Sequence, residues 1–157
     1  INKNMKRILF ICLGNICRSP AAEGVMKAIV HSAGRDNEYE IDSAGIGGWH
    51  VGQLPDLRMR KHGSDRGYKF DSRARQFSHD DFSCFDYIFA MDNDNYRDII
   101  SMARSAEERS KVLMFTNYLK QHIGVMAVPD PYYGGGDDFE YALDLIEDAC
   151  IGLFDML

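Results

Sequence analysis

The chain has 157 residues, 45% of them hydrophobic, and its 24 Asp and Glu exceed its 18 Lys and Arg, which gives a formal net charge of −6. This length and composition predict one folded domain and exclude a disordered chain, and the longest apolar run, residues 8–13, is too short to span a membrane. The negative charge disfavours a nucleic-acid partner. Four cysteines and no secretory signal indicate a cytoplasmic protein without a membrane partner.

The beginning of the chain predicts a strand, a loop and a helix in succession. Residues 6–12 form a short apolar run without alternation, which is typical of a strand buried on both faces of a parallel sheet. A loop follows over residues 13–18. Ser19 and Pro20 then suit the N-cap and the first turn of a helix, because apolar residues recur at helical spacing until Gly34.

The rest of the chain repeats this alternation. The sequence pattern predicts strands over residues 39–44, 87–91 and 111–115, and helices from about residue 55, over 93–103 and over 137–157. Strands that alternate with helices predict a single-domain α/β fold, a four-stranded parallel sheet with helices on both faces. We assign this domain to residues 5–157 and interpret residues 1–4 as a leader or an expression remnant.

The last segment, residues 137–157, has an apolar stripe and an acidic face at helical spacing. We interpret the acidic face as a solvated helix surface, and it comprises Glu140, Asp144, Glu147, Asp148 and Asp155. Two isolated cysteines, Cys84 and Cys150, are interpreted as small core hydrophobes.

The segment after the first strand combines a cysteine and an arginine six positions apart, and it reads Cys12, Leu13, Gly14, Asn15, Ile16, Cys17, Arg18, Ser19. Ligands bind at the carboxyl ends of strands in such sheets, and a loop that leads into a helix can point its N–H groups at an oxyanion. Gly14 permits a close backbone approach or a positive φ. The Arg18 guanidinium suits two phosphate oxygens. The same surroundings favour a Cys12 thiolate, which can attack phosphorus and form a cysteinyl-phosphate.

Cleavage of a phosphate ester also requires a proton for the leaving oxygen. Asp130 lies between Pro129 and Pro131, which stiffen the backbone on both sides and would present the carboxyl group in one direction. We therefore consider Asp130 a candidate general acid, although a turn-forming role is the commoner one for an Asp in this setting.

Four segments together resemble the low-molecular-weight protein tyrosine phosphatase family: FICLGNICRSPAAEG (10–24), DSAGIGGWHVG (42–52), FDYIFAMD (85–92) and PDPYYGG (129–135). The resemblance extends from about Lys6 to Leu157. It implies a flavodoxin-like sheet, phosphotyrosine-bearing protein substrates, inhibition by phosphate or vanadate-like oxyanions, and no metal or cofactor. It also implies Cys12 as nucleophile, Arg18 as phosphate clamp, and Asp130 as general acid and then base.

The resemblance further implies supporting positions. Residues that would hold the loop are Asn15, Ser19, Ser43 and Asp92. Residues that would line the mouth of the site, where aromatic walls favour a phenyl ring, are Trp49, His50, Tyr132 and Tyr133. Spacing and resemblance also suggest a disulfide between Cys12 and Cys17 under oxidant. Some family members carry a histidine at the position of Ser72, so this part of the supporting network differs here.

Two other functions stay open at the level of the sequence. Arsenate reductases share the loop and the fold but need further redox cysteines after the third strand, where residues 91–105 contain none. A phosphotyrosine-binding module without turnover would not require a nucleophile, a clamp and an acid together. Because all three candidates are present, the sequence favours hydrolysis of phosphotyrosine and other aryl phosphate monoesters.

Overall fold

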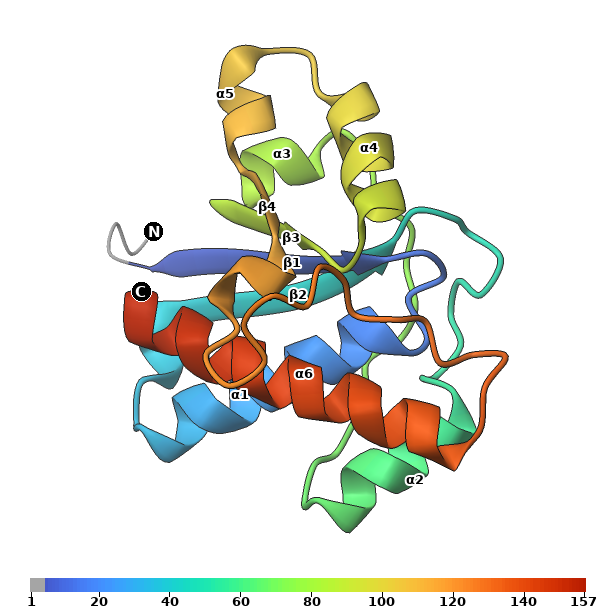
Figure 1. The fold of residues 1–157 in the computed structure, drawn as a ribbon. Coiled ribbons are helices and arrows are strands. Elements are labelled where there is room, and N and C mark those ends of the chain that lie inside the picture. The colour runs from blue at the N-terminus through green and yellow to red at the C-terminus, as the bar shows by residue number, and fades with distance from the viewer. Residues whose placement is uncertain (1–4) are drawn as a thin grey trace.

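The computed structural model describes residues 5–157, and it contains one four-stranded parallel sheet between two layers of helices (Figure 1). Residues 1–4, interpreted above as a leader, lie outside the described residues. The strands are β1 (Lys6–Cys12), β2 (Tyr39–Gly45), β3 (Tyr87–Ala90) and β4 (Val112–Met114), in the order β2-β1-β3-β4. The predicted α/β fold is therefore confirmed, and the four predicted strands are present with small shifts at their ends.

The helices divide between the two faces of the sheet. One layer contains α1 (Arg18–Ser32) and α6 (Gly136–Met156), with α2 (Leu57–Asp65) packed against α6. The opposite layer contains α3 (Asp81–Cys84), α4 (Asn93–Met102) and α5 (Ala106–Ser110). Two 3-10 turns, η1 (Asp36–Glu38) and η2 (Phe115–Tyr118), complete the structure. No helix within residues 5–157 has the length and hydrophobicity of a membrane span.

The two-layer arrangement explains the unbroken apolar run of β1. Ile8 and Phe10 belong to the core under α1 and α6, whereas Leu9 and Ile11 belong to the core under α3 and α4. All four side chains are fully buried. A central strand covered on both faces needs apolar residues at successive positions, as the sequence indicated.

The start of α1 differs from the prediction. The helix begins at Arg18 with Cys17 in the N-cap position, and no side chain caps it. Ser19 was predicted as the N-cap, which is wrong, because its hydroxyl group lies 3.0 Å from Cys12 Sγ and accepts a hydrogen bond from Asn15 Nδ2. The hydroxyl group is therefore engaged with the end of β1 and not with the helix terminus.

The acidic face of α6 is only partly a solvated surface. Asp148 is 6% exposed and accepts hydrogen bonds from the backbone N–H groups of residues 120–122, so its assignment to a solvated face is wrong. Glu140, Asp144 and Glu147 bind Arg66, which follows the last residue of α2. The acidic residues therefore join α6 to two neighbouring segments.

The two isolated cysteines have different environments. Cys150 is fully buried, as predicted, but Cys84 is exposed, so its assignment to the core is wrong. In this segment Phe82 and Phe85 occupy the core instead. Cys84 is the last residue of the short helix α3 and lies on its outer side.

Candidate active site

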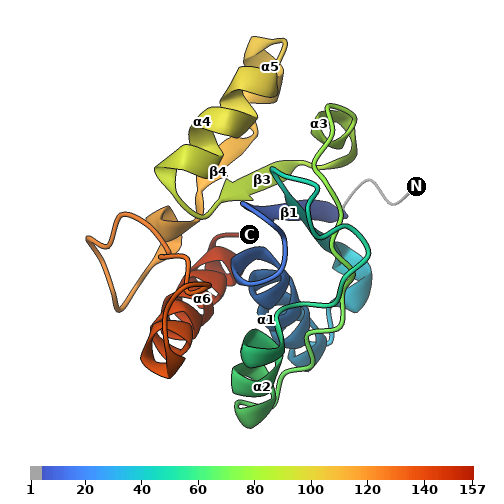
Figure 2. The ribbon, with the colours of Figure 1, turned by 90° about the vertical axis from the view of Figure 1, so that its right-hand side faces the viewer.

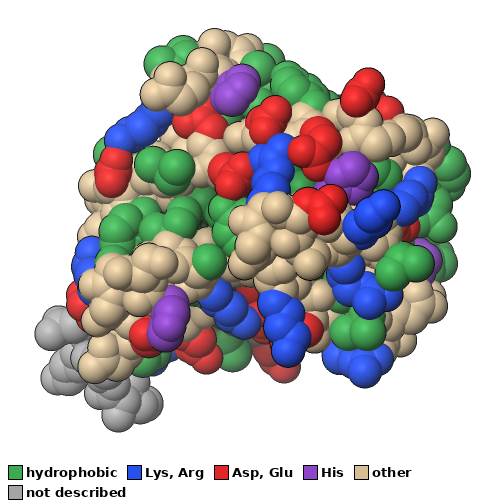
Figure 3. Space-filling view, turned by 90° about the horizontal axis from the view of Figure 1, so that it is seen from below, with side chains coloured by type: hydrophobic (Ala, Val, Ile, Leu, Met, Phe, Trp, Pro, Cys, Tyr) green, Lys and Arg blue, Asp and Glu red, His purple; other side chains and the backbone are tan. Residues whose placement is uncertain are grey.

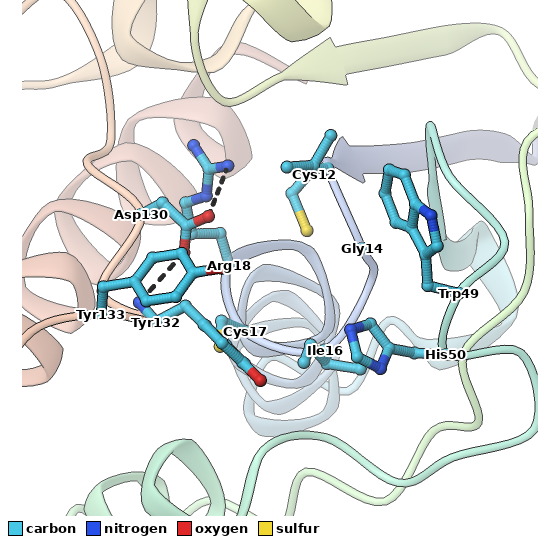
Figure 4. Close-up of a pocket in the computed structure, with 11 residues that line it drawn as sticks. Cys12, Gly14, Ile16, Cys17, Arg18, Trp49, His50, Asp130, Tyr132 and Tyr133 are labelled. Atoms are coloured by element: carbon cyan, nitrogen blue, oxygen red, sulfur yellow. Dashed lines mark hydrogen bonds and ion pairs between the residues drawn. The ribbon is translucent and has the colours of Figure 1, made fainter.

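The candidate site lies at the carboxyl edge of the sheet, where β1 ends and α1 begins (Figure 2). A cavity of about 330 Å³ opens there (Figure 4). It is lined by Cys12, Leu13, Gly14, Ile16, Cys17, Arg18, Trp49, His50, Asp130, Tyr132 and Tyr133. The structure thus brings together three segments that are far apart in the sequence, and every lining residue is among those singled out above.

Asn15 holds the curl of the loop between β1 and α1. It has a φ of 58°, in the left-handed region that Asn tolerates better than most residues. Its side chain donates to Ser19 Oγ at 2.8 Å and to Ser43 Oγ at 2.9 Å, and accepts from the Arg75 N–H group at 3.0 Å. The buried network that the resemblance implied for Asn15, Ser19 and Ser43 is therefore present.

Two glycines allow close approach around this loop. A Cβ atom at Gly45, the last residue of β2, would lie 3.0 Å from the backbone of Gly14 and Asn15. A Cβ atom at Gly14 would lie 3.1 Å from the His50 ring. Gly14 therefore serves the close approach that was one of its two predicted roles, and the positive φ falls on Asn15 instead.

The Cys12 thiol group lies at the floor of the cavity. Figure 4 shows its sulfur directed into the open space, although the residue as a whole is only 3% exposed. Ser19 Oγ lies 3.0 Å from the sulfur. The loop of residues 13–17 connects Cys12 to the first turn of α1, whose free backbone N–H groups and helix dipole favour negative charge in the cavity.

Arg18 is buried beside the sulfur and is held by two acceptors. Its Nη1 donates to Asp92 Oδ2 at 2.6 Å and to the Val128 carbonyl group at 3.0 Å. Burial opposes the charged form, but Cys12 and Asp92 together hold the pKa of Arg18 above its ordinary value. The buried Nε makes no hydrogen bond within residues 5–157, and Nη2 lies 3.6 Å from Asp130 Oδ2. An anion that binds here would meet the unpartnered Nε and would compete with the Asp130 carboxylate for Nη2.

Asp92 has two roles at the same position. One carboxylate oxygen binds Arg18, and the other accepts from the Asn95 N–H group at 2.8 Å as the N-cap of α4. The hydrogen bond from the helix N-terminus fixes the position of the Asp92 carboxylate. The arginine is therefore oriented by the beginning of a helix on the opposite face of the sheet.

Cys17 contrasts with Cys12 although both line the cavity. Burial, together with the nearby Asp56 carboxylate, raises the pKa of the Cys17 thiol well above its ordinary value. Cys17 is therefore a neutral thiol at neutral pH. Both cysteines are free in this structure.

Two walls flank the mouth of the cavity, as Figure 4 shows. Trp49 and His50 form one wall, and Trp49 is 68% exposed. Tyr132 and Tyr133 stand beside Asp130 on the other wall, with their rings edge to face at 4.9 Å. An aromatic group that entered between these walls would meet apolar surfaces on both sides.

Three contributors to the site carried no recognised signal in the sequence. Glu23 on α1 is buried and accepts a 2.6 Å hydrogen bond from Ser43 Oγ, and Arg75 binds Asn15 through its N–H group. Arg58 binds the carbonyl oxygen of Tyr132. Glu23 is the only carboxylate in α1 and is flanked by small and apolar residues, which was a usable hint. The two arginines depend on tertiary contacts between distant segments.

The cavity shows no arrangement suited to a metal ion. Within residues 5–157, no group of three or more His, Cys, Asp or Glu residues is placed to hold one. What the site offers is a thiol group, a guanidinium group, a helix N-terminus and one carboxyl group around a space of small-molecule size. Those groups suit the binding of an oxyanion and attack on its central atom.

Comparison with known proteins supports this chemistry. The family model described as low molecular weight phosphotyrosine protein phosphatase matches residues 7–157. The low molecular weight protein-tyrosine-phosphatase of Streptomyces coelicolor is 43% identical over 148 residues, which cover 94% of this chain and 90% of that protein.

Two solved structures are also similar over most of their length. One is a protein tyrosine phosphatase from Entamoeba histolytica with Hepes in its active site, at 45% identity, a TM-score of 0.92, and coverage of 96% of this chain and 95% of that one. The other is a Drosophila arginine phosphatase, at 33% identity, a TM-score of 0.88, and 97% coverage of each chain. On the full-length family match and this identity, the chain belongs to the low molecular weight phosphotyrosine protein phosphatase family, and its enzyme class is protein-tyrosine-phosphatase.

Proposed function

We propose that the enzyme hydrolyses phosphotyrosine monoesters through a cysteinyl-phosphate on Cys12. The thiolate attacks phosphorus, so that an S–P bond forms while the bond from phosphorus to the tyrosine oxygen breaks. Asp130 donates its proton to the leaving oxygen, and its carboxylate then takes a proton from the water that attacks the cysteinyl-phosphate. Phosphate leaves, and both groups return to their starting states.

The observation that carries this proposal is the placement of three groups around one cavity. The Cys12 sulfur points into it, the buried Nε atom of Arg18 has no hydrogen-bond partner within residues 5–157, and Asp130 lies across the mouth from Trp49, with its Oδ2 atom 3.6 Å from Arg18 Nη2. Arg18 would bind two phosphate oxygens through its planar fork and orient phosphorus toward sulfur. The related Entamoeba enzyme holds Hepes, a sulfonate, in its active site, which is consistent with an oxyanion site in the family.

The walls of the cavity favour a phenyl ring over a guanidinium group. A similar protein is an arginine phosphatase, so phosphoarginine is the substrate class to distinguish. A guanidinium leaving group needs acceptors or carboxylates around it. Of the residues that line this cavity, Asp130 alone is acidic, and Trp49, Tyr132 and Tyr133 surround the mouth. We therefore assign phosphotyrosine as the substrate.

The test compares variants on aryl phosphates and phosphopeptides. We expect Cys12→Ser to abolish turnover, and Asp130→Asn to lower kcat/KM on phenyl phosphate by roughly 10²–10⁴-fold, the usual contribution of a general acid. Cys84→Ser, an exposed cysteine remote from the cavity, should retain full activity. Acid quenching followed by mass spectrometry should show phosphate on Cys12. Persistent turnover in Cys12→Ser, or faster hydrolysis of a phosphoarginine peptide than of its phosphotyrosine counterpart, would refute the assignment.

A further inference from the structure

Arg58, the second residue of α2, is fixed to the loop between β1 and α1 through Asp56. The Asp56 carboxylate accepts from Arg58 Nε at 3.1 Å and from Arg58 Nη2 at 3.0 Å. The Asp56 N–H group in turn donates to the Ile16 carbonyl group at 2.7 Å. The guanidinium group of Arg58 is therefore held in one orientation relative to the floor of the cavity.

The same guanidinium group reaches the segment that carries Asp130. Arg58 Nη2 donates to the Tyr132 carbonyl group at 2.9 Å, and the guanidinium carbon lies 5.5 Å from the centre of the Tyr132 ring. It also lies 4.7 Å from the centre of the Phe139 ring on α6. Figure 1 shows the first turn of α2 beside the segment that leads from residue 130 into α6.

Val128 is fixed by hydrogen bonds to Arg18 and Met91, and Asp130 Oδ2 lies 3.6 Å from Arg18 Nη2, but the backbone that follows Val128 has few other supports. Pro129 and Pro131 have no N–H group to donate. The Tyr132 N–H group donates to Asp130 Oδ1 at 3.1 Å, within the segment itself. Among the hydrogen bonds of residues 5–157, only the one from Arg58 reaches the backbone of residues 129–134 from another element.

We propose that Arg58 is a positioning residue for the general acid. It joins the cavity floor, through Asp56, to the carbonyl group of Tyr132, and the N–H group of Tyr132 orients the Asp130 carboxyl group. Arg58 does not line the cavity, so it acts on the proton transfer only through Asp130. The inference rests on the general-acid role proposed above for Asp130.

The test measures kcat/KM, which reports formation of the cysteinyl-phosphate, on aryl phosphates with different leaving groups. Phenolate is a poor leaving group and needs the proton from Asp130, whereas 2,4-dinitrophenolate leaves without it. We expect Arg58→Ala to lower kcat/KM on phenyl phosphate by roughly 10- to 100-fold, the scale of a misplaced catalytic group, and to change it little on 2,4-dinitrophenyl phosphate. In Arg58→Ala/Asp130→Asn, no loss beyond that of Asp130→Asn alone should appear.

Two further variants separate positioning from loss of structure. Arg66→Ala removes three ion pairs with α6 but no contact with Tyr132, and should lower the free energy of unfolding without changing the leaving-group dependence. Arg58→Lys retains a cation over Phe139 but lacks the fork that binds Asp56 and Tyr132 together, and should show the same dependence on the leaving group as Arg58→Ala.

Each outcome bears on one of the two proposals. The inference about Arg58 would be overturned if Arg58→Ala and Arg58→Lys lost kcat/KM equally on all leaving groups. It would also be overturned if the loss in Arg58→Ala added to that of Asp130→Asn, or if Arg66→Ala showed the same dependence on the leaving group as Arg58→Ala. If Asp130→Asn itself shows no dependence on the leaving group, the proposed role of Asp130 fails, and the inference fails with it.

Discussion

At the scale of single residues, the two cysteines that line the cavity have different environments. Cys12 and Cys17 line the same cavity, yet the Cys12 sulfur is directed into the open space and lies 3.0 Å from Ser19 Oγ, whereas Cys17 is the buried N-cap residue of α1. Burial and Asp56 keep Cys17 neutral by raising the pKa of its thiol. The chemistry of the two cysteines therefore follows from their contacts.

This difference predicts the order of oxidation. Peroxide should oxidise Cys12, whose sulfur faces the open cavity, to a sulfenic acid first, and the Cys17 sulfur should then give up its proton, attack that sulfur and release water to form a disulfide. We expect a Cys12–Cys17 peptide by mass spectrometry and full recovery of activity with dithiothreitol. Cys17→Ser should instead accumulate irreversible sulfinic acid at Cys12, while Cys84→Ser should recover like the unmodified protein. Sulfinic acid at Cys12 without a disulfide in the unmodified protein would contradict this prediction.

The sequence predicted the identity of the site residues better than their local geometry. Cys12, Arg18 and Asp130 line one cavity, as expected from the motif for the first two and from the flanking prolines and the family resemblance for Asp130. Ser19, by contrast, was interpreted as a helix cap, because a serine before a proline suits that role in sequence alone. Its hydroxyl group lies beside Cys12 Sγ instead, an arrangement that depends on Asn15 and on the curl of the loop.

At the scale of elements, α6 fits against the rest of the molecule through a small residue. A Cβ atom at Gly152 would lie 1.8 Å from the carbonyl oxygen of Tyr118 in η2. That distance is far shorter than any contact between carbon and oxygen, so a larger side chain would push the two elements apart. Gly152 therefore sets how closely α6 approaches η2.

Two alanine substitutions in α6 test this contact. We expect Gly152→Ala to lower the free energy of unfolding by about 1–3 kcal/mol, as overpacked cores do. Gly136→Ala, in the first turn of the same helix, meets no atom closer than 3.6 Å and should raise the free energy by about 0.4–1 kcal/mol. Urea denaturation measures both values. Equal effects of the two substitutions would show that the helix, and not the contact with Tyr118, determines the result.

At the scale of the whole molecule, the acidic C-terminal segment holds distant parts of the chain together. Asp148 on α6 binds three successive backbone N–H groups and the ring of His122. Burial opposes its charge, but the hydrogen bonds from His122 and from the backbone hold the pKa of Asp148 below its usual value. Hydrogen bonds from Arg66 likewise lower the pKa of Glu140.

These shifts predict how stability changes with pH. A carboxylate whose pKa is lower in the folded state stabilises the protein above about pH 4, and that contribution disappears as the pH falls through the folded value. We expect Asp148→Asn to lower the free energy of unfolding by about 1–3 kcal/mol at pH 7, and the difference from the unmodified protein to shrink below about pH 4.

Urea denaturation at pH 7 and at pH 3 measures this difference. Asp155→Asn is the matched control, because Asp155 lies on the exposed part of the same helix and pairs there with Lys120 from another segment. This substitution should change the free energy of unfolding little at either pH. A loss in Asp148→Asn that is equally large at both pH values would contradict the role of the Asp148 charge.

The distribution of charge over the whole molecule differs from what the composition indicated. Figure 3 shows acidic side chains around basic and histidine side chains on the face that includes α6, where Arg66 binds three carboxylates. Several carboxylates of α6 are therefore paired with a cation, which the formal net charge of −6 does not reveal. At the cavity, we expect Arg18 and the start of α1, at contact distance, to matter more for anion binding than the distant surface charges.

The family resemblance supplied the wall residues of the candidate site, and no sequence pattern predicted the short helices α3 and α5. The sequence by itself determined the fold class, the four strands, the four longer helices, and the loop from Cys12 to Arg18 as the candidate site. These follow from local patterns: apolar runs covered on both faces, helical periodicity, and a cysteine and an arginine joined by one short loop. Only the tertiary structure decided the curl at Asn15, the burial of Glu23 and Asp148, and the link from Arg58 to Tyr132. Each of these is a contact between segments distant in the sequence, and no local pattern records which distant partner a polar side chain will meet.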